Sequence, residues 1–274
     1  MTITRFLEEL KHSAYYGDQI VRAERLPERE ACYAEPRDPL HPAMKSTLET
    51  LGIAQLYTHQ VAAIDQIRAG KHVVVVTSTA SGKTICYNVP VLETMLSDPT
   101  CRALYLFPTK ALAQDQLRGL LRYRDAATGL PFTAGTYDGD TTQATRRKLR
   151  DEGNIILTNP DMLHQGILPN HTRWGDFFTN LRYVVIDEIH AYRGIFGSNV
   201  ANVIRRLIRI CSHYDSHPKF ICCSATISNP KELAEKMTGV SLNVVGGGDD
   251  GSPKGSKSFL LWNPPHLDES MVER

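Results

Sequence analysis

The sequence predicts an α/β fold in which a mostly parallel sheet is covered by helices on both faces. From residue 72 onward, short segments that are apolar at nearly every position alternate with segments of helical periodicity. Strands that are buried on both faces and joined by helical crossovers have this pattern. Residue types suited to binding phosphate also follow several of these strands, and right-handed crossovers bring such strand ends to one edge of the sheet.

The elements follow from these patterns in chain order. Strands are predicted at residues 72–76, 102–107, 132–137, 154–158, 181–187 and 219–225. Helices are predicted at residues 82–96, 109–124, 141–152 and 199–211, with a short helix after Pro160. The last long helix has its apolar residues at helical spacing, so that one face packs on the sheet. These residues are Val200, Val203, Ile204, Leu207, Ile208 and Cys211.

The two ends of the chain differ from this central part. Residues 1–50 read as an amphipathic helix followed by a lead-in rich in proline and charge, which places the main domain at residues 51–245. Residues 246–258 are rich in glycine and other turn-forming residues, and 259–265 read as a single strand. We therefore expect residues 246–274 to form a linker and the first strand of a second domain.

Composition excludes several classes of protein. The net charge is +1, so nucleic-acid binding would need a local basic patch rather than an overall basic field. No apolar run approaches the roughly 20 residues that span a bilayer, and charged residues near the N-terminus do not fit a signal peptide. The six cysteines include no CxxC pair, which favours reduced thiols and a cytoplasmic protein.

The segment "TSTASGKT", residues 77–84, has the features of a phosphate-binding loop. It follows a predicted strand and opens a helix, where backbone N–H groups can bind phosphate. Lys83 would reach the β- and γ-phosphates of ATP, and the Thr84 hydroxyl would ligate Mg²⁺. The remaining loop positions that we expect to bind the nucleotide are Thr79, Ala80, Ser81 and Gly82. Thr77 replaces the usual first glycine, so a turn of small residues with a surface lysine also fits the pattern.

A pair of acids, Asp187 and Glu188, follows the apolar strand "YVVI". The aspartate could hold Mg²⁺ through water, and the glutamate could activate the water that attacks the γ-phosphate. Two solvated carboxylates at a strand end are a common alternative. The parallel topology favours the catalytic interpretation, because it brings these acids to the same sheet edge as Lys83.

Two further clusters of polar residues follow predicted strands. Hydroxyl and amide groups at helix starts can bind the phosphates of a single strand without reading its sequence. Each cluster alone could equally be a helix cap. The candidate nucleic-acid-binding residues are Pro108, Thr109 and Lys110 after one strand, and Thr158, Asn159 and Asp161 after another.

Taken together, these motifs resemble the first RecA-like motor domain of superfamily 2 helicases of the DEAD/DEAH-box kind. The resemblance covers residues 45–274 and rests on "LYTHQVAAI", "TASGKT", "FPTKALAQDQ", "YDGD", "TNPDMLH", "DEIHAYRGIFG" and "CSATISNP". More narrowly, the set is similar to the bacterial mitomycin-repair helicases and their fungal RecQ-related relatives. This implies ATP and Mg²⁺ as cofactors, single-stranded nucleic acid, most simply DNA, as partner, and a role in DNA repair. It also implies that Gln60 reads adenine, and that His190, Ser224 and Thr226 couple the nucleotide site to strand movement.

The resemblance further implies a second RecA-like domain that is absent from these residues. No QxxGRxGR-like stretch, which would supply arginine fingers, occurs in the sequence. The chain is therefore expected to be a fragment that hydrolyses ATP poorly and does not unwind by itself. Two alternatives stay open: an ATPase of another P-loop class, and a weakly catalytic remnant that binds nucleic acid or a partner without productive turnover.

Overall fold

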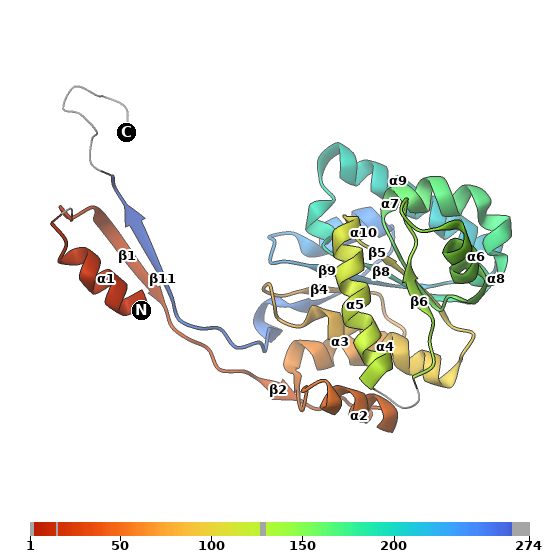
Figure 1. Ribbon diagram of the computed structural model, residues 1–274, viewed down its shortest axis with the longest axis horizontal. Coiled ribbons are helices and arrows are strands. Elements are labelled where there is room, and N and C mark those ends of the chain that lie inside the picture. Colours follow the sequence, from red (N-terminus) through yellow and green to blue (C-terminus); the bar gives the residue numbers. More distant parts are fainter. Residues whose placement is uncertain (1–2, 15, 127–129, 265–274) are drawn as a thin grey trace. The chain divides into compact units, whose positions relative to one another are not determined.

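The computed structural model describes residues 3–14, 16–126 and 130–264, and the chain divides into two compact units (Figure 1). The larger unit is Cys32–Ser252, and the smaller one combines the described parts of residues 1–31 and 253–274. These boundaries differ from the expected ones at residues 50 and 246, because residues 32–50 and 246–252 pack within the larger unit.

A seven-stranded sheet forms the centre of the larger unit, and all of its neighbouring strands are parallel. The strand order is β10-β4-β9-β8-β5-β7-β6. In chain order these strands are β4 (Val73–Val76), β5 (Arg102–Leu106), β6 (Ala134–Thr136), β7 (Ile155–Thr158), β8 (Leu181–Ile186), β9 (Lys219–Ser224) and β10 (Asn243–Gly246). The predicted parallel sheet is confirmed, and all six predicted strands lie in it.

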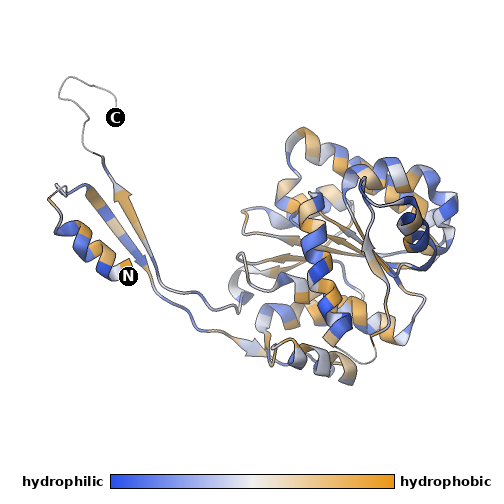
Figure 2. Cartoon of the chain, viewed as in Figure 1, coloured by the Kyte–Doolittle hydropathy of each residue, from blue (hydrophilic) through white to orange (hydrophobic). Residues whose placement is uncertain are grey.

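Helices cover both faces of this sheet, as the sequence predicts. One face packs against α2 (Pro42–Thr50), α3 (Thr58–Arg68), α4 (Lys83–Ser97) and α5 (Lys110–Ala126). The other packs against α6 (Gln143–Glu152), the short turns α7 (Pro160–Met162), η1 (Leu163–Ile167) and η2 (Leu168–Trp174), α8 (Gly175–Thr179), α9 (Gly194–His213) and α10 (Pro230–Thr238). Figure 2 shows apolar strands between helices of mixed hydropathy. Successive strand residues alternate between the two cores, so that Cys222 and Cys223 face opposite sides.

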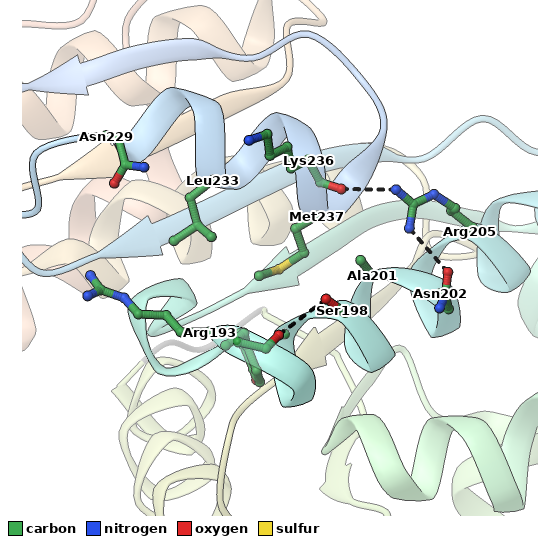
Figure 3. Close-up of a pocket in the computed structure, with 12 residues that line it drawn as sticks. Arg193, Ser198, Ala201, Asn202, Arg205, Asn229, Leu233, Lys236 and Met237 are labelled. Atoms are coloured by element: carbon green, nitrogen blue, oxygen red, sulfur yellow. Dashed lines mark hydrogen bonds between the residues drawn. The ribbon is translucent and has the colours of Figure 1, made fainter.

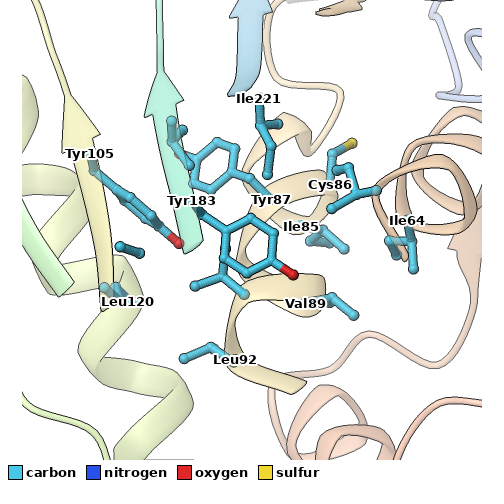
Figure 4. Packing of buried hydrophobic residues seen from close by; sticks show 14 of the residues in the cluster. Ile64, Ile85, Cys86, Tyr87, Val89, Leu92, Tyr105, Leu120, Tyr183 and Ile221 are labelled. Carbon is cyan, nitrogen blue, oxygen red and sulfur yellow. The ribbon is translucent and has the colours of Figure 1, made fainter. Parts of the chain in front are cut away.

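Buried tyrosines fix α4 against the sheet (Figure 4). The rings of Tyr87 and Tyr105 lie edge to face, with centroids 5.3 Å apart. The Tyr105 hydroxyl donates to Asn88 Oδ1 at 3.1 Å, and the Tyr183 hydroxyl lies 2.8 Å from Thr94 Oγ1. Because buried hydroxyls cost free energy unless they are hydrogen-bonded, these contacts fix one position of α4. The start of α4, which carries the loop of residues 77–84, is therefore held firmly.

Several elements were not predicted from the sequence. β10 is an edge strand of the main sheet, although its residues adjoin a glycine-rich stretch that reads as a linker. A small antiparallel pair, β2 (Tyr33–Ala34) with β3 (Leu56–Tyr57), joins the lead-in to the start of α3. Two short 3₁₀ turns, η3 (Ile189–Ala191) and η4 (Gly247–Asp249), follow β8 and β10. Each of these elements is short, so local periodicity could not identify it.

The smaller unit contains α1 (Ile3–Lys11), β1 (Ile20–Leu26) and β11 (Lys257–Trp262). β1 pairs antiparallel with β11, with Leu26 opposite Lys257 and Ile20 opposite Trp262. The expected terminal strand thus exists, and its partner is the N-terminal segment. Residues 265–274, which include the end of the expected segment 259–265, lie outside the described residues.

The cysteines and the helices agree with the expectations from composition. All six cysteines are free thiols, and five of them are buried: Cys86, Cys101, Cys211, Cys222 and Cys223. Burial raises the pKa of the Cys222 thiol to about 12, so it behaves as a small apolar side chain. Across the described residues, no helix combines the length and the hydropathy needed to cross a bilayer.

Candidate functional site

The loop between β4 and α4 has the geometry of a phosphate-binding loop. Gly82 adopts a left-handed conformation with φ of 75°, and a Cβ there would lie 2.6 Å from Gln60 Nε2, so any other residue would strain the backbone and displace the Gln60 amide. Lys83 Nζ donates to the carbonyl oxygens of Ser78 at 2.9 Å and Thr77 at 3.3 Å. The ammonium group thus lies within the curve of its own loop, where a phosphate could replace the two carbonyls.

Gln60 is almost fully buried, and its amide holds this loop. Its Oε1 accepts from the backbone N–H of Tyr57 at 2.9 Å, and its Nε2 donates to the carbonyl of Gly82 at 3.2 Å. Both ends of the amide therefore have protein partners. The expected reading of adenine by Gln60 would require an exchange of these bonds, and it stays a prediction.

The acid pair lies where β8 ends. Asp187 is only 5% exposed; its Oδ1 accepts from the N–H of Glu188 at 2.8 Å and its Oδ2 accepts from the Tyr87 hydroxyl at 3.3 Å. Desolvation by burial raises the pKa of Asp187 to about 6, and the charge of Glu188 acts in the same direction. Glu188 itself has a φ of 51°, a strained conformation for a residue with a side chain and one that often occurs at functional sites.

The loop and the acid pair meet at one edge of the sheet. In the parallel ladders, Val76 at the end of β4 pairs with Ser224 of β9, and Ile186 at the end of β8 pairs with Cys222. Lys83 is close enough to Asp187 to lower the pKa of its carboxyl, partly offsetting the effect of burial. Tyr87, one turn along α4 from Lys83, forms a hydrogen bond to the same carboxylate.

His190 connects the acid pair to the turn that follows β9. Its Nδ1 lies 3.1 Å from Glu188 Oε2 and 3.3 Å from the backbone nitrogen of Ala225. As an acceptor, this nitrogen binds the N–H of Ala225; when protonated, it can donate only to Glu188. His190 can therefore exchange partners between the two strand ends.

The two residues beside Ala225 take less part in this contact than expected. The Ser224 side chain is fully buried, and its Oγ has no hydrogen-bond partner among the described residues. Thr226 is exposed. The observed bond thus involves the backbone of Ala225, not the hydroxyls of Ser224 and Thr226. A buried hydroxyl without a partner is unusual, which leaves Ser224 able to accept a new bond if the site rearranges.

Asp250 and His59 also belong to this site, although no sequence pattern indicated their roles. Asp250 is 5% exposed, and its Oδ2 accepts from the Ser78 hydroxyl at 3.1 Å. His59 lies 3.8 Å from the other carboxylate oxygen of Asp250, and its Nε2 lies 3.1 Å from the carbonyl of Ser81. Residues 246–252, expected to be a linker, therefore fold back and brace the phosphate-binding loop. A hydrophilic turn carries no local signal for such a contact.

The first cluster of candidate nucleic-acid contacts is largely accessible. Pro108 is half-buried, while Thr109 and Lys110 are exposed at the start of α5. Lys110 Nζ forms an ion pair with Asp140 Oδ2 at 2.9 Å, and this hydrogen bond raises the pKa of the ammonium group. Lys110 is therefore positively charged and located at the sheet edge, while its partner comes from the "YDGD" segment.

The second cluster divides into structural and accessible residues. Thr158 is 1% exposed, and its hydroxyl donates to the carbonyl of Tyr137 at 2.6 Å, so its side chain is not accessible in this structure. Asn159 caps α7, with its Oδ1 accepting from the N–H of Met162 at 2.8 Å. Asp161 is exposed. The hydroxyl of Thr158 thus links the end of β7 to the residue that follows β6, and its contact with nucleic acid stays a prediction.

The oxygen atoms present fit a magnesium ion held together with a nucleotide. The described residues contain no group of three or more His, Cys, Asp or Glu that could bind a metal by themselves. Mg²⁺ usually keeps several waters and takes one or two protein oxygens plus substrate phosphates. The Asp187 carboxylate supplies oxygens of that kind at this edge, and Thr84, which would supply a hydroxyl, is the residue after Lys83 at the start of α4.

The fold and this edge define the class of protein: the chain belongs to the DEAD/DEAH box helicase family, whose match spans residues 57–233. It is 49% identical over 270 residues to the uncharacterized ATP-dependent helicase YprA of Bacillus subtilis (strain 168), covering 98% of this chain and 35% of that protein. It is 39% identical over 279 residues to the ATP-dependent helicase HRQ1 of Saccharomyces cerevisiae (strain ATCC 204508 / S288c), covering 100% of this chain and 25% of that protein.

A solved structure shows the same likeness. The crystal structure of the DUF1998 helicase MrfA bound to DNA superposes with a TM-score of 0.92 at 49% identity, covering 98% of this chain and 37% of that one. The chain therefore spans roughly a quarter to two fifths of the relatives that it matches. The resemblance inferred from the sequence is confirmed.

Proposed function

We propose that the chain is the ATP-binding motor domain of an ATP-dependent DNA helicase. One observation carries this proposal: Lys83, Asp187 and the turn after β9 meet at a single sheet edge. The family membership supports ATP use, and the DNA bound in the MrfA crystal structure supports DNA as the nucleic acid. The buried free thiols are in keeping with a cytoplasmic location.

In this proposal each residue has a defined task. The loop N–H groups and Lys83 bind the phosphates, which draws the ammonium group away from the carbonyls of Thr77 and Ser78. Thr84 and Asp187 hold Mg²⁺, which neutralises charge on the phosphates. Glu188 orients the attacking water and accepts its proton, because it is the accessible member of the acid pair.

His190 then links the state of Glu188 to the turn that follows β9. A change in the charge or position of Glu188 alters its contact with His190 Nδ1, and therefore the bond to Ala225. The turn after β9 can move in response. Arginines from a second RecA-like domain would stabilise the transferred phosphoryl group, as in related motors, at a gain of roughly 10³–10⁵ in rate.

Nucleic-acid-stimulated ATP hydrolysis tests the proposal. We expect single-stranded DNA to stimulate turnover by the wild-type chain, and Lys83→Ala and Glu188→Gln each to abolish the stimulation. Lys45→Ala, which removes an exposed lysine from α2, is the matched control and should behave as wild type. Binding of DNA without turnover in every version would instead support the weakly catalytic remnant.

A further inference from the structure

The segment "AYRGIFG", residues 191–197, is not explained by the nucleotide site, but its geometry is specific. Gly194 has a φ of 58°, and a Cβ at Gly197 would lie 2.4 Å from the carbonyl oxygen of Tyr192. This tight turn sets the ring of Phe196 5.7 Å from that of buried Tyr192. Phe196 is nevertheless 43% exposed, and Ile195 is 84% exposed. The turn thus presents the ring of Phe196, which packs against Tyr192 and is partly open to solvent.

Phe196 borders a groove between α9 and the segment that follows β7. The groove encloses about 390 Å³. Pro160, Asp161 and His164 line one side, and α9 lines the other with Phe196, Val203, Arg206 and Arg209 among its residues. The groove therefore begins directly after the cap Asn159, and it includes Asp161 of the cluster that was predicted to contact nucleic acid.

The charge of this groove favours an anionic ligand. α9 has no acidic residue in its 20 positions. Within the described part of the chain, neither Arg206 nor Arg209 forms an ion pair with a carboxylate. Arg206 Nη1 lies 3.4 Å from His164 Nδ1 and 3.5 Å from its carbonyl oxygen, which fixes the guanidinium at the groove. Among the described residues that line the groove, Asp161 is the one acid.

A second groove, on the other side of α9, offers a useful contrast (Figure 3). It is larger, at about 550 Å³, and also contains basic residues. There Arg205 donates to the carbonyl of Lys236 at 3.3 Å and to Asn202 Oδ1 at 3.4 Å. Lys236 in turn forms an ion pair with Glu232 at 2.6 Å. Lys236 therefore has a carboxylate partner in this second groove, whereas Arg205, like Arg206, is held by uncharged groups of the protein. Neither Arg206 nor Arg209 has a carboxylate partner among the residues that the structure describes.

We propose that the groove between residues 160–164 and α9 binds single-stranded nucleic acid. Arg206 and Arg209 contact phosphates, and a base stacks on the exposed face of Phe196. Aromatic platforms beside cationic side chains bind single strands with little sequence preference, because every base has a face that can stack. This inference rests on the proposed function, since it extends the path of a nucleic-acid strand that is bound at the edge of the β-sheet.

The affinity of the 274-residue chain for fluorescein-labelled oligo-dT, measured by fluorescence anisotropy over a salt series, tests the inference. Phe196→Ala should weaken binding about 5- to 100-fold, whereas Phe196→Tyr should retain most of the affinity. The double variant Arg206→Gln/Arg209→Gln should lower the slope of log K against log salt by about 1.4, or about 0.7 for each phosphate on a single strand. Arg205→Gln, one residue away but facing the other groove, is the control and should bind as wild type.

The outcomes separate this inference from the proposed function. If the wild type binds DNA and its ATP turnover is stimulated, while neither the Phe196 variant nor the double variant differs from it, the groove proposal is overturned and the motor function stands. An equal loss in Arg205→Gln would also overturn it, because the effect would then reflect overall charge. If the wild type binds no single strand at all, both proposals fail. Unchanged thermal melting of the variants shows that a loss of binding is not a loss of folding.

Discussion

Lys83, the proposed phosphate-binding residue, is held in place by the protein itself. Its ammonium group donates to two carbonyls of its own loop, and Gln60 and Asp250 hold that loop from either side. The loop is therefore shaped by contacts outside the phosphate site. Substitution of Asp250, which is not predicted to touch the nucleotide, should therefore affect nucleotide affinity through the loop alone.

The Asp250 carboxylate provides a direct test of this support. Asp250→Ala removes the acceptor for Ser78, the acceptor for Ser252 and the acid beside His59. We expect ATP affinity to fall about tenfold, which corresponds to the loss of the hydrogen bond that reaches the loop at Ser78. Isothermal titration with ATP and Mg²⁺ would measure this. Asp249→Ala is the control, because Asp249 is exposed and the bond that it makes to Thr58 uses its backbone carbonyl, which the substitution keeps. Equal losses in both variants would argue against a supporting role for Asp250.

Burial of Asp187 has a cost that depends on pH. Its folded-state pKa of about 6 exceeds the ordinary value of 3.8. The folded chain therefore holds a proton that the unfolded chain releases, and stability falls as pH rises from about 4 to about 6. Above that window the penalty is about 3 kcal/mol, at 1.36 kcal/mol per pKa unit.

Asp187→Asn should remove this penalty. We expect the variant to be up to about 3 kcal/mol more stable than the wild type near pH 7.5, with the gain vanishing near pH 4. Urea unfolding at both pH values measures the difference. Asp249→Asn is the comparison, because that residue is exposed and its substitution should change stability little at either pH. A gain for Asp187→Asn that is the same at both pH values would contradict the assignment to ionisation.

The helices and strands show which patterns are reliable. The valines of β4 and the apolar stripe of α9 predicted the strand and the helix correctly. In β4 every residue is apolar, and α9 is long enough for its helical periodicity to show which face is buried. β10 was missed since its last residue, Gly246, begins a run of glycines that reads as a turn. β1 was missed because its sequence, "IVRAERL", is mostly exposed and carries three charges, and its partner β11 lies far along the chain.

Two glycines in helices should respond oppositely to the same substitution. At Gly119 in α5 an added Cβ would meet no atom within 4 Å, so Gly119→Ala should stabilise the fold by about 0.5–1 kcal/mol. Gly197→Ala places its Cβ against the Tyr192 carbonyl and should destabilise by about 1–3 kcal/mol. Thermal and urea unfolding would measure both. A stabilising Gly197→Ala would mean that the turn before α9 is free to adjust.

Charge distribution, not total charge, suits this chain to nucleic acid. The net charge is +1, yet α9 carries three arginines and no acid. Acidic residues elsewhere in the chain balance the total charge but do not remove the positive potential beside α9. At 0.15 M salt this potential extends only about 8 Å. Binding of a strand should therefore depend on a few side chains, which makes the substitutions above informative.

Residues 1–274 alone should bind ATP but not separate strands. The sequence contains no QxxGRxGR-like stretch, and arginines of that kind contribute roughly 10³–10⁵ to the rate in related motors. A fluorescence strand-displacement assay on the purified chain measures this, with ATP binding as the control for a folded site. Robust ATP-dependent unwinding by these residues would contradict the expectation and would show that this chain supplies every group that the reaction needs.

Local patterns along the chain were enough to establish the parallel sheet and the edge at which Lys83, Asp187 and Glu188 meet. Burial on both faces and the spacing of motifs are properties of neighbouring residues. Other features depended on contacts between distant residues. Asp250 reaches Ser78 across 172 positions, and β1 pairs with β11 from the opposite end of the chain. Thr158, predicted from its place after a strand to contact nucleic acid, is buried and donates to the carbonyl of Tyr137. Such pairings depend on tertiary packing, because the residues that make them come close to one another only in the folded chain.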